Sequence, residues 1–239
     1  MNRETLAELA VTDLQLLGIS VDRGALHECC DYLRRILGAN ESVNLTAIRN
    51  PEAALRLHLV DSLAVLPEVR SAPDGPLCDI GSGGGFPGVP LCLATGRDGV
   101  VLDSARRKMD AVSAVLDAMG VPGVTTVHGR AEEYALESPY AFAVVTSRAV
   151  ADLPILVEYA APLLSHSGAF VALKGAPSKG EFERGLRAAD LCGMELKSVR
   201  DYVLPRGGEA RQALLFARTG EPAVRLPRTV GRAAKRPLA

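Results

Sequence analysis

An acidic residue followed by a glycine-rich run, DIGSGGGFPG at residues 79–88, is the part of this chain best suited to bind a ligand. Because glycine has no Cβ, such a run can turn sharply and lie close to a bound molecule. Pro87 could open a helix there, and the N–H groups at a helix N-terminus can meet a polar ligand. A carboxylate at Asp79 suits a ligand with a cationic amino group better than a bare pyrophosphate. We therefore predict that this loop binds S-adenosylmethionine.

Two more acidic residues lie where other groups of such a cofactor would be bound. Asp103 ends the second predicted strand, about 20 residues after the glycines, where a carboxylate can accept hydrogen bonds from ribose hydroxyls. Glu132, in the sequence RAEE at residues 130–133, follows the third predicted strand and could accept a hydrogen bond from an adenine amino group. Acids in the first turn also stabilise helices without any ligand, so both interpretations of Glu132 stay open.

A nicotinamide dinucleotide is the alternative ligand. Residues 83–88 also fit the spacing G-x-G-x-x-G, and Asp103 would serve a dinucleotide equally well. The position of Asp79 before the loop, the helical segment upstream and Glu132 favour S-adenosylmethionine.

The first 70 residues show apolar residues at helical spacing. Helix starts are indicated by Asp22 and by Asn50 followed by Pro51, and helix ends by Gly18 and Gly38. One further helix is expected to carry four leucines on a single face, at positions 55, 59, 63 and 66. A linker-like break follows at residues 71–76.

Strands and helices alternate from Leu77 onward. Five βα units followed by a hairpin predict an α/β fold, a Rossmann-like and mostly parallel seven-stranded sheet with an antiparallel edge, as in class I S-adenosylmethionine-dependent methyltransferases. Ligands of such sheets bind outside the carboxyl ends of the strands, where the strand order reverses. We expect a helical extension at 1–70, a cofactor-binding domain at 71–218 and a basic tail at 219–239. The predicted strands are 77–80, 99–103, 124–128, 141–147, 169–174, 198–204 and 212–218, and the predicted helices lie near 87–94, 105–119, 152–164 and 179–191.

Composition narrows the class of protein. The chain has 239 residues, 48% of them hydrophobic, which suffices for a sizeable core. No apolar run approaches the length of a membrane span, and we expect a cytoplasmic monomer. The five cysteines form no C-x-x-C pair, so no metal site is predicted. The net charge of −1 gives no global basic field, so any nucleic-acid surface must be local.

The last fifteen residues form a basic run without an acid. They are either a solvated tail or an arm that contacts phosphates. In both interpretations we expect the tail to play no part in cofactor binding. Its cations are Arg225, Arg228, Arg232, Lys235 and Arg236.

Taken together, short motifs spread over most of the chain resemble the small-subunit ribosomal RNA methyltransferase G family, once called glucose-inhibited division protein B. Two departures are Gly84, where many members carry Pro, and the pair Arg232-Ala233, where Thr-Pro is frequent. The matching segments are Asn44-Leu45-Thr46 with Arg49, residues 58–62, the loop 79–88, residues 102–104, 130–133, 147–149 and 172–175, and the ending 231–238.

The resemblance implies an enzyme that moves a methyl group from S-adenosylmethionine, leaving S-adenosylhomocysteine, to N7 of one guanine in 16S ribosomal RNA. Its partner would be that RNA or the small ribosomal subunit. The cofactor residues expected from the loop argument and the resemblance are Asp79, Gly81, Gly83, Gly85, Phe86, Asp103, Ala131, Glu132 and Arg148. The residues expected to contact RNA are Asn44, Arg49, His58, Arg130, Lys174, Arg211, Arg228, Arg232, Lys235 and Arg236.

Guanine N7 has a free lone pair and can attack a sulfonium methyl group without losing a proton, so no general base is required. Arg148 and Lys174 are the residues expected to position the guanine or its phosphates, because both lie near the ends of predicted strands. Solvent-facing charges are the alternative for each. His58 and Asp61 share a helical face, which would either dock the helical extension on the sheet or contact RNA.

Other functions remain open at this stage. A small-molecule methyltransferase on the same fold is the main alternative, although aromatic residues make up only 4% of the chain. A non-enzymatic nucleotide-binding module is a further one, and the three acids at 79, 103 and 132 argue against it.

Overall fold

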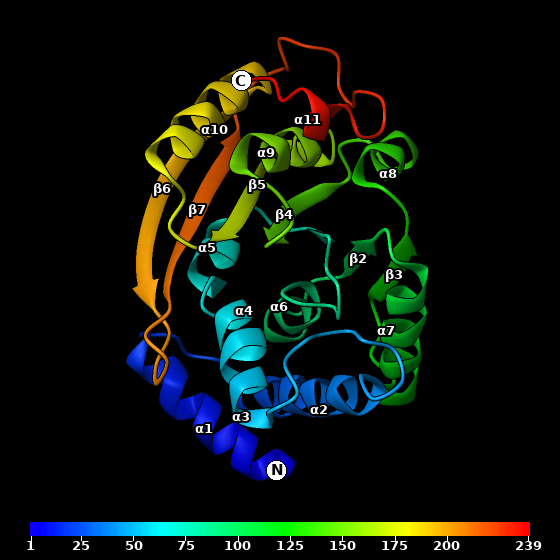
Figure 1. The fold of residues 1–239 in the computed structure, drawn as a ribbon, viewed down its shortest axis with the longest axis vertical. Coiled ribbons are helices and arrows are strands. Elements are labelled where there is room, and N and C mark those ends of the chain that lie inside the picture. The colour runs from blue at the N-terminus through cyan, green and yellow to red at the C-terminus, as the bar shows by residue number, and fades with distance from the viewer.

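The computed structural model describes residues 1–239 and contains one seven-stranded sheet in the order β3-β2-β1-β4-β5-β7-β6 (Figure 1). β1 to β5 are parallel, whereas β7 pairs antiparallel with β5 and with β6, as predicted. The order reverses at β1, which pairs with β2 on one side and with β4 on the other. The strands are β1 (Leu77–Ile80), β2 (Gly99–Asp103), β3 (Val124–His128), β4 (Phe142–Arg148), β5 (Leu164–Lys174), β6 (Met194–Val203) and β7 (Ala210–Arg218).

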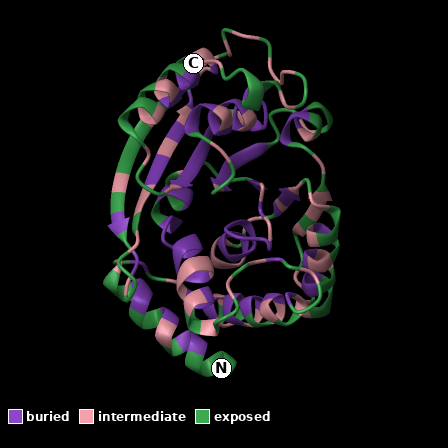
Figure 2. Ribbon diagram, viewed as in Figure 1, coloured by how far each residue is buried: buried purple, intermediate pink, exposed green.

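The central strands are buried on both faces, as expected of parallel strands covered by helices (Figure 2). Two apolar clusters account for this burial, one of 37 and one of 22 buried residues. The larger joins the N-terminal helices to the helices that follow β1 and β2, and the smaller lies under the helices that follow β3, β4 and β5. Each cluster thus joins residues of more than one segment of the chain. We still propose a division into three segments, at 1–70, 71–218 and 219–239.

The helices begin largely where the sequence indicated. Asp22 accepts a hydrogen bond from the N–H of Ala25 at 3.0 Å, and Asn50 accepts one from Ala53 at 3.0 Å, so both predicted caps are confirmed. None of the helices is both long and apolar enough to cross a membrane. The helices are α1 (Arg3–Leu16), α2 (Arg23–Ala39), α3 (Pro51–Ala54), the π-helical turn η1 (Leu55–Val60), α4 (Asp61–Leu63), α5 (Leu66–Ser71), α6 (Gly88–Thr95), α7 (Arg106–Met119), α8 (Ala131–Glu137), α9 (Leu153–Ala160), α10 (Lys179–Leu191) and α11 (Arg232–Lys235).

Two predictions in the N-terminal region are wrong. Gly38 does not end α2, which continues through Ala39 because Gly38 keeps helical dihedral angles. The helix predicted to follow Asn50 is not continuous, since a π-helical turn at Leu55–Val60 interrupts it. The four leucines at 55, 59, 63 and 66 are nevertheless all fully buried, so the apolar face was identified correctly.

The basic tail is folded against the protein rather than solvated along its length. It lies beside α8 and α9, coloured orange to red in Figure 1, and contains the short helix α11. Ala233 is only 1% exposed, and Leu226 and Leu238 pack on the smaller core cluster. The interpretation as a solvated tail is therefore wrong.

Candidate active site

The glycine loop is held from below by α2 and by a buried carboxylate. The Tyr32 hydroxyl, fully buried, donates to the Gly84 carbonyl at 2.8 Å. A Cβ at Gly85, whose φ is +80°, would collide with that hydroxyl. A Cβ at Gly83, whose φ is +58°, would meet no protein atom within 4 Å. The loop thus rests on α2 through Gly84 and Gly85 and opens to the other side at Gly83.

Asp79 supports this loop from inside and does not face a ligand. Its Oδ2 accepts the Gly88 N–H at 2.9 Å and its Oδ1 accepts the Thr146 hydroxyl at 2.9 Å. Burial raises the pKa of Asp79 to about 7, against the lowering effect of these two hydrogen bonds and of Arg148. The prediction that Asp79 meets a cationic amino group directly is wrong, because its side chain is 0% exposed and both oxygens are occupied.

A pocket of about 300 Å³ opens at the carboxyl ends of β1, β2 and β3. Its volume lies at the lower end of the range typical of small-molecule sites, about 300–1,000 Å³. Five of the nine residues predicted for the cofactor line it: Gly81, Gly83, Asp103, Ala131 and Glu132. Ser104, Lys108, Val150 and Tyr159 also line it and were not identified from the sequence.

Asp103 fixes the floor of this pocket. Its Oδ2 accepts the Gly83 N–H at 2.9 Å, and its Oδ1 accepts the Ala105 N–H at 2.8 Å. Ser82, in the same loop and 3% exposed, has a hydroxyl with no hydrogen-bond partner in the protein. Open space at Gly83 and an unpartnered hydroxyl beside it fit a polar ligand bound along the loop.

A second pocket, of about 340 Å³, adjoins the first at Ala149, the residue that follows β4. Ala149 lines both pockets. It has a φ of +55°, a left-handed conformation that is unfavourable for a residue with a Cβ and that recurs at functional sites. The second pocket combines apolar walls with cations, its lining being Ile48, Leu57, His58, Asp61, Arg148, Ala149, Leu173, Lys174, Gly175 and Arg211.

The cations of the second pocket are held by protein groups. The Arg148 guanidinium donates to the Leu57 carbonyl at 2.9 Å and to Asp61 Oδ2 at 3.0 Å. Asp61, 2% exposed, also pairs with Arg211 at 3.3 Å and accepts from the Tyr202 hydroxyl at 3.2 Å. This polar cluster docks the N-terminal helices on the sheet, one of the two roles considered for the face of His58 and Asp61.

Lys174 holds the loop after β4. Its Nζ donates to the Ala151 carbonyl at 2.9 Å and pairs with Glu181 Oε1 at 2.7 Å. The same Glu181 oxygen accepts the Leu153 N–H, at the start of α9, at 3.0 Å. Lys174 therefore borders the second pocket with its charge already paired.

His58 is neutral in this setting. Burial, and then the nearby Arg148, lower its pKa to about 4. Its Nε2 lies 2.8 Å from the Thr46 hydroxyl, its Nδ1 lies 3.5 Å from an Arg148 nitrogen, and its ring stacks on Phe86 at 5.2 Å between centroids. Because arginine can only donate, the ring hydrogen belongs on Nε2.

The structure also places the remaining residues that were predicted to contact the cofactor or RNA. Four residues expected to contact the cofactor do not line its pocket: Asp79 and Phe86 are buried, Gly85 faces α2, and Arg148 lines the second pocket. Among the residues expected to contact RNA, Asn44, Arg49, Arg130, Arg232, Lys235 and Arg236 are exposed.

Arg228 differs from the other cations of the tail, because it pairs through two nitrogens with the buried Glu158 of α9. The tail also reaches the first pocket, since the Gly231 N–H donates to Glu132 Oε1 at 2.9 Å. We expected no contact between the tail and the cofactor residues, and the structure shows one.

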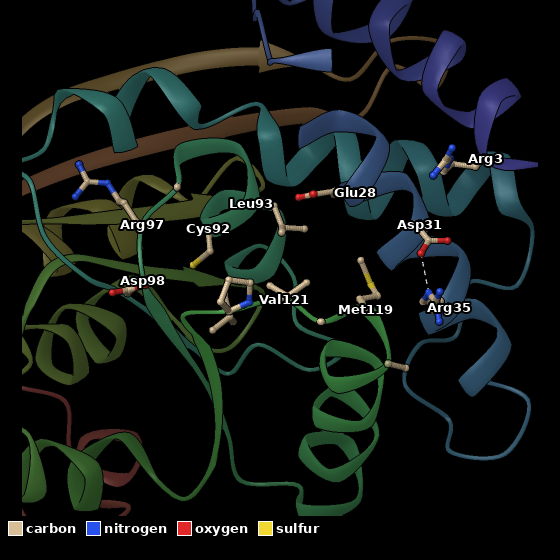
Figure 3. A pocket seen from close by; sticks show the side chains of 15 residues that line it. Arg3, Glu28, Asp31, Arg35, Cys92, Leu93, Arg97, Asp98, Met119 and Val121 are labelled. Atoms are coloured by element: carbon tan, nitrogen blue, oxygen red, sulfur yellow. Dashed lines mark hydrogen bonds and ion pairs between the residues drawn. The ribbon is translucent and has the colours of Figure 1, made fainter. Parts of the chain in front are cut away.

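A larger cavity, of about 420 Å³, lies at the opposite ends of the strands, between α1, α2 and the turns before β2 and β3 (Figure 3). Its charged residues include Asp31, which pairs with Arg35 at 2.7 Å, and it contains none of the predicted site residues. No group of three or more His, Cys, Asp or Glu side chains in the structure could hold a metal ion.

Comparison with known proteins decides the family. The family model described as rRNA small subunit methyltransferase G matches residues 26–207. The chain belongs to this family. It is 38% identical over 227 residues to the ribosomal RNA small subunit methyltransferase G of Desulfitobacterium hafniense, covering 94% of each chain, and 35% identical over 213 residues to that of Lactobacillus delbrueckii subsp. bulgaricus, covering 87% of this chain and 89% of the relative.

Solved structures support the fold alone. A precorrin-6y C5,15-methyltransferase from Geobacter metallireducens matches with a TM-score of 0.51 at 15% identity, over 66% of this chain and 87% of that one. A 1,6-didemethyltoxoflavin-N1-methyltransferase from Burkholderia thailandensis, solved with S-adenosylhomocysteine, matches with a TM-score of 0.52 at 13% identity, over 67% and 77%. These likenesses show the fold alone, and the predicted fold class is confirmed.

The two glycines that face opposite ways give a first prediction. Gly83→Ala should fold with a modest loss of stability, because its Cβ enters open space although a φ of +58° is strained for alanine. It should weaken S-adenosylhomocysteine binding at least tenfold by filling the pocket floor. Gly85→Ala should instead destabilise the protein, because its Cβ collides with the Tyr32 hydroxyl. Calorimetric titration and urea unfolding of both variants separate the effects. Equal effects of the two substitutions on both measurements would contradict this assignment of the two loop faces.

Asp79 gives a prediction on stability. Its pKa is raised in the fold to about 7 from an ordinary value of 3.8, so the folded state favours the protonated acid. Its contribution is fully present below about pH 4 and is lost as the pH rises towards 7, at most ~1.4 kcal/mol per pH unit. Asp79→Asn keeps an acceptor for the Gly88 N–H and offers an amide N–H to the Thr146 hydroxyl, which can accept as well as donate. Its stability relative to the wild type should therefore increase over that window.

Urea unfolding from pH 5 to pH 8 measures this difference. Asp110→Asn, at an exposed carboxylate of α7, is the matched control and should track the wild type at every pH. A difference between Asp79→Asn and the wild type that is constant with pH would show that Asp79 is already ionised in the fold.

Proposed function

We propose that this protein transfers a methyl group from S-adenosylmethionine to N7 of a guanine in 16S ribosomal RNA. The observation that supports it most is the pair of pockets that meet at Ala149. One contains the glycine loop and Asp103, and the other has apolar walls with a cationic rim. The names of the relatives point to the small-subunit RNA as the substrate.

The first pocket would hold the cofactor. Gly81 and Gly83 would lie against its chain, Asp103 would receive the ribose hydroxyls, and Glu132 would receive the adenine amino group. When bound, S-adenosylmethionine supplies an electrophilic methyl group on a sulfonium. The residues of this pocket then bind and orient, and none of them needs to exchange a proton.

The second pocket would hold the guanine, and its groups fit a nucleophile that needs no base. The Asp61 carboxylate is occupied by Arg148, Arg211 and Tyr202. His58, with a pKa lowered to about 4, has little affinity for a proton at neutral pH. Alignment alone can lower a barrier by about 7–11 kcal/mol in favourable cases. We assign Arg148 a positioning role, since it fixes the π-helical turn that forms one wall.

Arg49, which is exposed and follows the lining residue Ile48, would meet an RNA phosphate and supply affinity without base information. Arg130, also exposed, borders the first pocket and would do the same there. Both pockets are built from one chain, which suits a monomer. A small-molecule substrate is the second candidate, and the exposed Arg49 beside the second pocket favours RNA over it.

Radiolabelled S-adenosylmethionine tests the function with naked 16S RNA, small subunits and whole ribosomes as alternative substrates. We expect one 7-methylguanosine per RNA molecule, identified by nuclease digestion and mass spectrometry, with at least one of the three substrates. Label in a different nucleoside, or no label in any RNA form, would contradict the proposal.

The absence of a general base gives a prediction on His58. His58→Ala should leave the single-turnover rate within about tenfold, or ~1.4 kcal/mol, because its proton affinity is too low for a base. His128→Ala, at the exposed end of β3, is the matched control. A loss of several orders of magnitude in the chemical step, with folding and RNA binding intact, would overturn the claim that the enzyme only positions its substrates.

A further inference from the structure

We propose that the C-terminal segment, residues 225–239, is part of the cofactor site and positions Glu132 to recognise the adenine ring. This inference rests on the proposed use of S-adenosylmethionine and gives the C-terminal segment a function in the cofactor site.

The contact that carries the inference joins the tail to the wall of the cofactor pocket. Glu132 lines that pocket, is 6% exposed and accepts the Gly231 N–H through Oε1 at 2.9 Å. A carboxylate has about four acceptor positions, so this bond fixes the side chain and leaves capacity for an amino group. The tail therefore restrains the orientation of this carboxylate through the Gly231 N–H.

A second anchor holds the tail in that place. Arg228 pairs with Glu158, which is 3% exposed on α9, and also donates to the Arg236 carbonyl at 2.9 Å. This closes the segment around Gly231. Removing Arg228 would leave the buried Glu158 carboxylate without its partner, and the contact through two nitrogens requires a guanidinium at this position.

The two anchors meet at one residue of the pocket. Tyr159 of α9 lines the cofactor pocket, and its pKa is raised by burial and then by the charges of Glu132 and Glu158. Glu158 directly precedes Tyr159 in α9, and Glu132 lines the same pocket as Tyr159. Tail docking and the shape of the adenine end of the pocket are coupled through Glu132, Tyr159 and Glu158.

The first test is ligand discrimination, measured by calorimetry with S-adenosylhomocysteine and S-inosylhomocysteine, in which an oxygen replaces the adenine amino group. The full chain should prefer the adenosyl compound by about 10- to 100-fold, as expected for one charge-assisted hydrogen bond. Deleting residues 228–239 in a Glu158→Gln background, which removes the carboxylate that the loss of Arg228 would leave unpaired at position 158, should reduce the preference to threefold or less.

The controls are full-length Glu158→Gln and Arg225→Ala, an exposed cation of the same segment, and Arg225→Ala should keep the full preference. A folded deletion variant that keeps the preference would overturn the proposal, as would a full chain that binds both compounds equally. Failure of the full chain to bind S-adenosylhomocysteine at all would instead refute the proposed function.

A second measurement uses the intact chain and does not depend on the deletion variant folding. Coupling between two sites is reciprocal, so a ligand that contacts Glu132 should stabilise the tail. Amide hydrogen exchange across residues 229–236 should slow at least threefold when S-adenosylhomocysteine is bound. Unchanged exchange there, with slowed exchange in the glycine loop, would overturn the proposal.

Discussion

The buried carboxylate of Asp61 is the interaction on which the arrangement of this site depends. It lies at the junction of η1 and α4 and receives donors from β4, β6 and β7 through Arg148, Tyr202 and Arg211. Removing one partner from a buried charge typically costs about 3–5 kcal/mol, because the remaining charge is left without compensation. The N-terminal helices are thereby fixed across the carboxyl ends of the strands, and the second pocket exists only because they are.

The same constraint explains the chemistry that the site can perform. The Asp61 carboxylate is engaged by three donors and Lys174 is paired with Glu181, while the pKa of His58 is lowered to about 4. Groups that would serve as a base in another enzyme are used here to hold the walls. A nucleophile with its own lone pair, such as guanine N7, is the substrate that fits this arrangement.

Much of the fold could be predicted from the sequence because helix caps, strands and turns depend mainly on neighbouring residues. The N-cap at Asn50, the strands of the sheet and the glycine loop each follow from neighbouring residues. The direction of the long side chains could not be predicted in this way. Arg148 meets Asp61 across 87 positions, and Arg228 meets Glu158 across 70, so only the tertiary fold reveals that these cations are paired. Asp79 shows the same limit, since its burial depends on how α6 and β4 pack around it.

The most direct test of the account is a crystal structure of the protein with S-adenosylhomocysteine and an RNA fragment that contains the target guanosine. The account predicts that the cofactor sulfur and guanine N7 face each other across Ala149, with the ribose on Asp103 and the base beside Arg148. A guanine bound elsewhere, or a cofactor outside the pocket of Gly83 and Asp103, would contradict it.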